Sequence, residues 1–257
     1  MPSTVLRIVG TLLRVTRAEL WPVHVRRGIA SGARWTLYPC SAYWRGTHEP
    51  GVQQTLLELG GGNILGWTCW DVGAHFGLYA VGLARRVGPT GQVAAFEPDP
   101  VSFSRLARHA RMNDLPGLKI YHAAVSNHSA GAEIYTYGQA GSTTTHLPYP
   151  GEPRSERAQP IKIDTLNLDA LVATGELRLP QFIKLDVEGH GAAALQGMAD
   201  SVARSRPVLL VALHSDQEIA GICRILDPLQ YERAEIVTGA SELEVGHDYL
   251  FRPKQRA

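Results

Sequence analysis

The stretch KLDVEGH places Asp186, Glu188 and His190 directly after an apolar run, and His214 ends the next apolar run along the chain. Carboxylates and imidazoles of this kind can accept a proton from a hydroxyl group. Because residues that follow neighbouring parallel strands meet at one edge of a sheet, we expect these four side chains to gather in one place. They are the candidate catalytic residues.

Two of these residues also have simpler interpretations. Gly189 and Gly191 flank His190, so EGHG could be a turn that starts a helix, with Glu188 at the positive end of that helix and His190 exposed. A divalent cation between Asp186, Glu188 and His214 is a further alternative. Such an oxygen-rich ligand set is not specific, and no metal site is predicted.

A second informative stretch, WDVGAHFGLYA, crowds small residues into the point where a strand becomes a helix. Gly73, Ala74 and Gly77 leave almost no side-chain volume there. Such turns commonly bring a ligand against the main-chain N–H groups at a helix start. We therefore expect a ligand close to the backbone at 73–77.

Glu97, in FEPDP, follows the next predicted strand, where a carboxylate can accept hydrogen bonds from both hydroxyls of a ribose. These features indicate a nucleoside-bearing cofactor. The spacing Gly73-x-x-x-Gly77 differs from the dinucleotide fingerprint G-x-G-x-x-G, and the nearby Asp71 would repel a pyrophosphate. A cofactor that carries an ammonium and a sulfonium group suits that acid better, so S-adenosylmethionine (SAM) is favoured over NAD.

The elements that position these residues alternate along the chain. Apolar, strand-like runs lie at 66–73, 91–99, 118–126, 181–189 and 206–214, with predicted helices at 77–87, at 100–113 and in a short segment ending at 203. Further short strands are expected in the polar stretch between the third and fourth runs. Strands separated by helices predict a doubly wound α/β fold with a mostly parallel sheet covered on both faces.

Four motifs in order, DVGAHFGLYA, FEPDP, AAVSN and FIKLDVEGHGAAALQG, resemble the FkbM family of SAM-dependent methyltransferases. The upstream RGTHEP, at 45–50, resembles the segment that precedes the domain in that family. The resemblance covers about 45–230. It implies a class I methyltransferase (Rossmann-like) sheet, SAM as methyl donor with S-adenosylhomocysteine (SAH) as product, and O-methylation of a hydroxyl on a small molecule, often a sugar or a secondary metabolite.

The resemblance also assigns cofactor-binding residues. It implies that the methionine end of SAM is lined by the turn after the first strand, with Asp71, Gly73, Ala74, His75 and Gly77. The ribose would be bound at the end of the second strand by Glu97 and Pro98, and the adenine wall would be formed by Ala123, Ala124 and Val125. Glu49, in the upstream segment, would approach the cofactor from the other side.

Two positions depart from the family pattern. His75 stands where the family usually has Asn, and Ala212 stands where a Glu is expected. A histidine can still donate one hydrogen bond, whereas an alanine cannot replace a carboxylate. Either the acceptor differs, or another acid substitutes, or catalysis has been lost. A SAM-binding protein without catalysis and an NAD-linked oxidoreductase are therefore the alternatives to a SAM-dependent O-methyltransferase.

The polar stretch 138–159 is rich in Gly, Pro, Ser and Thr. Loops of this length are commonly lids or binding segments, and the other interpretation is a solvated linker. Ser142 and Thr143, within it, are the candidate substrate contacts.

Composition limits the remaining functions. The 257 residues are 44% hydrophobic with a net charge of +1, which provides no broad field for nucleic acid, so a small-molecule acceptor is expected. Three well-separated cysteines form neither a disulfide framework nor a zinc pair, which predicts reduced thiols and a cytoplasmic protein. His24, His109, His128 and His247 are expected on the surface.

The N-terminal part, 1–44, is predicted to be a helical, basic extension of the methyltransferase domain at 45–257. Its apolar stretch 5–15 is interrupted by arginines and is too short to span a bilayer. We expect it to pack on the main domain or on a second subunit, in a homo-oligomer. Contact of its basic residues with an anionic membrane surface is the less favoured alternative.

Overall fold

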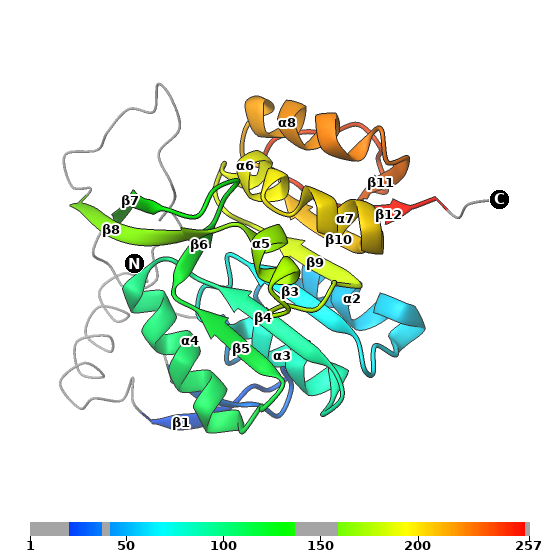
Figure 1. Ribbon diagram of the computed structural model, residues 1–257. Coiled ribbons are helices and arrows are strands. Elements are labelled where there is room, and N and C mark those ends of the chain that lie inside the picture. The colour runs from blue at the N-terminus through cyan, green and yellow to red at the C-terminus, as the bar shows by residue number, and fades with distance from the viewer. Residues whose placement is uncertain (1–20, 38–41, 137–158, 255–257) are drawn as a thin grey trace, which may run out of the picture.

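The computed structural model describes residues 21–37, 42–136 and 159–254 (Figure 1). Its main sheet has the strand order β11-β12-β10-β9-β3-β4-β5. The parallel strands are β3 (Thr68–Val72), β4 (Gln92–Phe96), β5 (Leu118–Tyr121), β9 (Phe182–Leu185) and β10 (Val208–Ala212), and the antiparallel edge consists of β12 (Asp248–Pro253) and β11 (Tyr231–Glu235). The predicted doubly wound, mostly parallel sheet of the class I methyltransferase type is confirmed.

The strand order reverses between β3 and β9. From β3 the chain continues outward through β4 to β5, whereas β9 leads to β10 on the other side. The carboxyl ends of β3 and β9 therefore lie at the switch point of the sheet, which is where such folds bind their ligands.

Helices cover both faces of the sheet (Figure 1). They are α2 (Pro50–Glu58) with the 3-10 turn η2 (Leu59–Gly62), α3 (Leu78–Val87), α4 (Pro100–Asn113), α5 (Leu168–Ala173), α6 (Gly191–Gln196), α7 (Ala199–Ser205) and α8 (Asp216–Leu226). Successive residues of a strand point to opposite faces. Accordingly Cys69 packs into one apolar cluster and its neighbour Trp70 into the other, both fully buried. The predicted helix at 100–113 matches α4.

The strand predicted at 118–126 is wrong in its extent. β5 ends at Tyr121, the partner of the last β4 residue, Phe96, so no main-sheet strand remains for the following residues to pair with. They form β6 (Ala123–Val125) in a separate three-stranded sheet, of order β6-β8-β7, with β7 (Gly131–Thr136) and β8 (Gln159–Leu166). The short strands expected in the polar stretch are thus present.

The described part of the predicted N-terminal extension is a β-hairpin rather than a helix, formed by β1 (Pro22–His24) and β2 (Arg34–Thr36). Trp35 is buried and stacks on His109 of α4, with ring centroids 3.5 Å apart. Apolar residues of 21–37 share a core cluster with α2 and α3. The hairpin therefore packs on the main domain, whereas the predicted helical stretch 5–15 and the candidates Ser142 and Thr143 lie outside the described residues.

The expectation that His109 lies on the surface is wrong, because it is 1% exposed. Its Nδ1 donates to the Phe76 carbonyl at 2.8 Å, and Thr36 Oγ1 lies 2.7 Å from its Nε2. Burial lowers the pKa of His109 to about 4, which keeps the ring neutral. This histidine joins the hairpin to α4.

None of the helices in the described ranges combines the length and hydropathy that crossing a membrane requires.

Candidate active site

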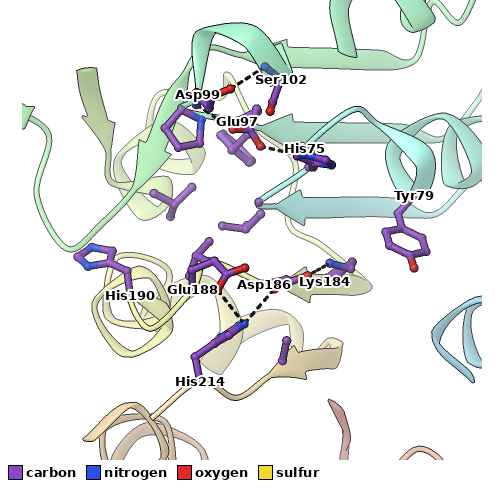
Figure 2. Close-up of a pocket in the computed structure, with 18 of the residues that line it drawn as sticks. His75, Tyr79, Glu97, Asp99, Ser102, Lys184, Asp186, Glu188, His190 and His214 are labelled. Carbon is purple, nitrogen blue, oxygen red and sulfur yellow. Dashed lines mark hydrogen bonds and ion pairs between the residues drawn. The ribbon is translucent and has the colours of Figure 1, made fainter. Parts of the chain in front are cut away.

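A cavity of about 410 Å³ lies at the carboxyl ends of β3, β4, β9 and β10 (Figure 2). Its size is typical of a small-molecule site. The structure brings into its lining all of the predicted catalytic residues and most of the predicted cofactor-binding residues. These are Asp186, Glu188, His190 and His214, and Glu49, Gly73, Ala74, His75, Glu97, Pro98, Ala123, Ala124 and Val125.

Asp71 and Gly77 do not line the cavity, contrary to the prediction. The Asp71 side chain is fully buried within β3, and burial raises its pKa to about 6, against the opposing influence of Lys184 on the paired strand. Gly77 has a φ of 86°, and a Cβ there would collide with Leu106 of α4. Its small size serves the packing of α3 on α4.

The crowding at Gly73 also has a cause within the protein. Gly73 has a φ of 86°, and a Cβ at this position would collide with the backbone carbonyl of Asp186. The loop after β3 therefore packs directly on the loop after β9. Glycine is needed there for protein packing, although the residue also lines the cavity.

Glu97 is held at the end of β4 by two backbone donors. One of its carboxylate oxygens accepts the N–H of His75 at 2.6 Å, and the other accepts the N–H of Asp99 at 2.8 Å. Asp99 in turn caps α4 by accepting the N–H of Ser102 at 2.8 Å. Burial raises the pKa of Glu97 to about 8. Each carboxylate oxygen has room for a second hydrogen bond, as a pair of ribose hydroxyls would require.

His75 presents a polar atom that lacks a protein partner within the described ranges. Its Nδ1 lies 2.7 Å from the Tyr43 hydroxyl, while its buried Nε2 has no hydrogen-bond partner there. Burial lowers the pKa of His75 to about 4, so the ring is neutral. A buried polar atom without a hydrogen bond destabilises the folded protein. We therefore infer that a bound ligand supplies the hydrogen-bond partner of this Nε2 atom.

The predicted catalytic cluster forms around Asp186 and His214 (Figure 2). Asp186 lies 2.8 Å from the ammonium of the buried Lys184, and Nε2 of His214 lies 3.5 Å from Asp186 and 3.7 Å from Glu188. His190 lies apart from these, with its Nε2 3.1 Å from the Ser126 hydroxyl. Three of the four predicted neighbours, Asp186, Glu188 and His214, thus lie together. His190 lines the same cavity but lies outside the cluster, contrary to the expectation.

The pKa of His214 is shifted by its surroundings. Burial alone would lower its pKa, but the carboxylates of Glu218, Asp186 and Glu188 together raise it. Burial likewise opposes the charge of Lys184, and Asp186 contributes most to raising the Lys184 pKa. Carboxylates in the cavity wall therefore stabilise the charge of Lys184 and the protonated form of His214.

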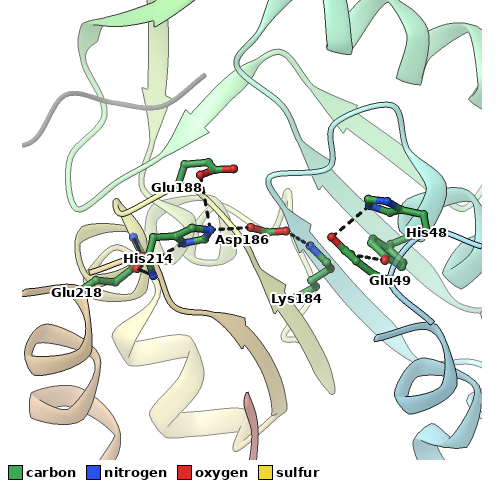
Figure 3. Close-up of polar contacts among 9 residues, drawn as sticks. His48, Glu49, Lys184, Asp186, Glu188, His214 and Glu218 are labelled. Atoms are coloured by element: carbon green, nitrogen blue, oxygen red, sulfur yellow. Dashed lines mark hydrogen bonds and ion pairs between the residues drawn. The ribbon is translucent and has the colours of Figure 1, made fainter. Parts of the chain in front are cut away.

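Glu218 is a site residue that sequence analysis missed. It is 2% exposed, and its two carboxylate oxygens accept the N–H groups of Gly191 and His214, both at 2.7 Å. One oxygen also lies 3.5 Å from Nδ1 of His214 (Figure 3). The signal for it is the pattern SDQE, a capping box at the start of α8 whose N-cap, Ser215, accepts the Glu218 N–H.

A second polar group approaches Lys184 from the other side of the cavity (Figure 3). Glu49, just before α2, accepts a hydrogen bond from the Tyr79 hydroxyl at 2.5 Å and lies 3.2 Å from Nε2 of His48. Burial would raise the pKa of Glu49, but His48, Lys184 and Tyr79 lower it to about 2. Glu49 is therefore a charged acid of the cavity lining, on the side of Lys184 opposite Asp186 (Figure 3).

Comparison with known proteins identifies the family. The family described as "Methyltransferase FkbM domain" matches residues 71–233. The chain belongs to this family. The resemblance inferred from the four motifs is thereby confirmed, and the chain is a SAM-dependent methyltransferase rather than an NAD-linked oxidoreductase.

Two relatives illustrate the range of similarity. The chain is 26% identical over 227 residues to "Hexuronic acid methyltransferase AglP" of Haloferax volcanii, an alignment that covers 87% of this chain and 85% of that protein. Among solved structures, the methyltransferase FkbM of Methylobacillus flagellatus KT is 18% identical, with a TM-score of 0.49. That alignment covers 72% of this chain and 43% of the other.

The residues present fit SAM. The cavity lining carries several carboxylates and, in the part of the chain that the structure describes, no arginine. Such a lining suits an ammonium and a sulfonium group and opposes a pyrophosphate. Glu97 and the unpartnered Nε2 of His75 supply polar atoms for the cofactor. Asp186, Glu188 and His214 do not, within the described ranges, form a set suited to a metal ion.

Proposed function

We propose that this protein transfers the methyl group of SAM to a hydroxyl of a small-molecule acceptor, a sugar or a glycosylated metabolite. The observation that carries the proposal is that one cavity holds both a buried carboxylate, Glu97, suited to a ribose and a separate charged cluster around Asp186. The relative that acts on hexuronic acid supports a sugar as the acceptor class.

The chain's residues divide into two groups around the cavity. Glu97 accepts hydrogen bonds from the ribose hydroxyls, and the adenine wall consists of Ala123, Ala124 and Val125. His190 lies next to this wall, because it contacts the hydroxyl of Ser126, the residue after Val125. The backbone at 73–75 and Glu49 face the methionine end. When bound, the cofactor supplies an electrophilic methyl group on a positively charged sulfur.

The acceptor lies against the Asp186 cluster. Its hydroxyl must approach the methyl carbon to about 3 Å in line with the bond that breaks, and such positioning supplies much of the rate acceleration. Asp186, fixed by Lys184, accepts a hydrogen bond from the acceptor, and the imidazole of His214 donates one. These two residues orient the acceptor, with Glu188 holding His214 from the cavity side.

The test is methyl transfer from SAM labelled with deuterium in its methyl group. Methyl glycosides of a hexose, a 6-deoxyhexose and a hexuronic acid serve as acceptors, and mass spectrometry detects the labelled product. Mild alkali then removes a methyl ester but leaves a methyl ether. We expect an alkali-stable product. An alkali-labile product would show transfer to a carboxylate, and SAM binding without any product would favour the non-catalytic alternative.

A further inference from the structure

Among the described residues, each acid of the cavity lining except one has a partner in the protein. Glu49 accepts from Tyr79, Glu97 from two backbone N–H groups, and Asp99 from Ser102, while Asp186 pairs with Lys184 and Glu188 lies beside His214. The exception is Asp248. Within the described ranges its carboxylate makes no hydrogen bond and no ion pair, although it lines the cavity. Its carboxylate can therefore contact a ligand without breaking an interaction with another described residue.

The position of Asp248 explains how it reaches the site. It begins β12 and is the direct antiparallel partner of Ala212, the last residue of β10. Directly opposed residues of an antiparallel pair project to the same face with Cβ atoms about 5 Å apart. Ala212 and Asp248 both line the cavity, and the side chain at 212 is only a methyl group. Ala212 is thus uncharged, and its strand partner carries a carboxylate.

The surroundings of Asp248 favour proton transfer. The residue is half-buried, and burial is the main cause that raises its pKa to about 6. Glu49 and Asp186 raise the pKa further, while Lys184 and His214 lower it, and the adjacent His247 is flanked by Glu235 and Glu244. A carboxylate of this kind is ionised near neutral pH and is a stronger base than an exposed aspartate.

We propose that Asp248 is the general base that accepts the proton of the acceptor hydroxyl. The proposal depends on the hydroxyl transfer proposed above. As the acceptor oxygen forms its bond to the methyl carbon, its proton passes to Asp248, and the electron pair of the broken carbon–sulfur bond stays on sulfur. Asp186 and His214 then orient the acceptor, and Asp248 completes the chemistry.

The experiment compares the wild-type protein with Asp248→Asn, using the glycoside that the wild type methylates best. We expect kcat to fall about a hundredfold, the usual scale for loss of a general base, while the Kd for SAH measured by calorimetry changes less than about twofold. The wild-type pH profile of kcat/KM should fall on the acidic side near the pKa of Asp248, and the variant should lose that limb. Glu244→Gln, an exposed acid of the preceding loop, is the matched control and should retain wild-type rates.

A double variant, Ala212→Asp with Asp248→Asn, places the carboxylate on the opposed strand and should restore part of the lost rate. Direct titration of the Asp248 carboxyl by carbon-13 NMR, assigned by the signal missing in Asp248→Asn, should give a midpoint well above that of an exposed aspartate.

Unchanged kcat in Asp248→Asn, or SAH affinity that falls as much as kcat, would overturn the proposal. A wild type that methylates none of the glycosides would instead overturn the proposed function itself.

Discussion

The carboxylate of Glu218 accepts the backbone N–H of His214 at 2.7 Å and lies 3.5 Å from Nδ1 of the same residue. The Glu218 side chain is inaccessible to solvent, whereas the His214 ring faces the cavity. Glu218 also accepts the N–H of Gly191 at the start of α6. One buried acid on α8 thus joins the segments that follow β9 and β10, positions the cavity histidine and raises its pKa.

Glu218→Ala should lower the free energy of unfolding by about 2–4 kcal/mol, because two buried backbone donors lose their acceptor at about 1–3 kcal/mol each. Urea denaturation checks this value. Glu244→Ala, at an exposed position, should cost less than about 0.5 kcal/mol. A Glu218 variant as stable as the control would show that water replaces the carboxylate without cost.

Glu97→Ala should weaken SAH binding by roughly 1.5–3 kcal/mol, since two ribose hydroxyls lose a charged acceptor. Isothermal titration calorimetry gives the affinity. Asp99→Ala is the comparison variant, because it removes the cap of α4 while leaving the Glu97 carboxylate in place. Equal affinity in the wild type and the Glu97 variant would place the ribose elsewhere.

The affinity for SAH should rise with pH up to about 8. Burial raises the pKa of Glu97 to about 8 in the free protein, and hydrogen bonds from a ribose favour the ionised carboxylate. Binding therefore lowers this pKa and releases a proton at pH values below it. Calorimetry in buffers of different ionisation enthalpy measures that release, which should vanish in Glu97→Gln. Proton uptake on binding would contradict the assignment.

Asp186→Asn and His214→Ala should each lower turnover by about tenfold to a hundredfold and leave SAH affinity nearly intact, because they act on the acceptor. Steady-state kinetics and calorimetry separate the two effects. Asp186→Asn should also lower stability, since the buried Lys184 loses its 2.8 Å partner. EDTA should leave turnover unchanged. Inactivation by EDTA that magnesium reverses would place a cation in the cluster.

SAH at a hundredfold excess over its Kd should stabilise the fold by about 2.7 kcal/mol, whereas NAD at the same concentration should not. Thermal unfolding monitored by circular dichroism measures the shift. Stabilisation by NAD alone would contradict the cofactor assignment.

Local sequence determined the alternation of elements and the identity of most site residues. Mostly apolar runs in β3, β4, β9 and β10, each followed by polar or small residues, indicate a parallel sheet, because strands buried on both faces are predominantly apolar. The carboxyl-end rule then placed Glu97, Asp186 and His214 in one cavity. These inferences succeed because they depend on neighbours in the chain.

Contacts between distant segments were decided only by the tertiary structure. Gly73 and Gly77 were expected to leave space for a ligand. In the structure, a Cβ at these positions would collide with Asp186 and Leu106, respectively, which are distant in sequence. His109 looked exposed until the N-terminal hairpin covered it. The pairing of Ala212 with Asp248 arises because β12 returns antiparallel to β10, and register across such a pair is set by the whole sheet. The sequence therefore indicates which side chains are available for binding and chemistry, and the tertiary structure determines which of them lie next to one another.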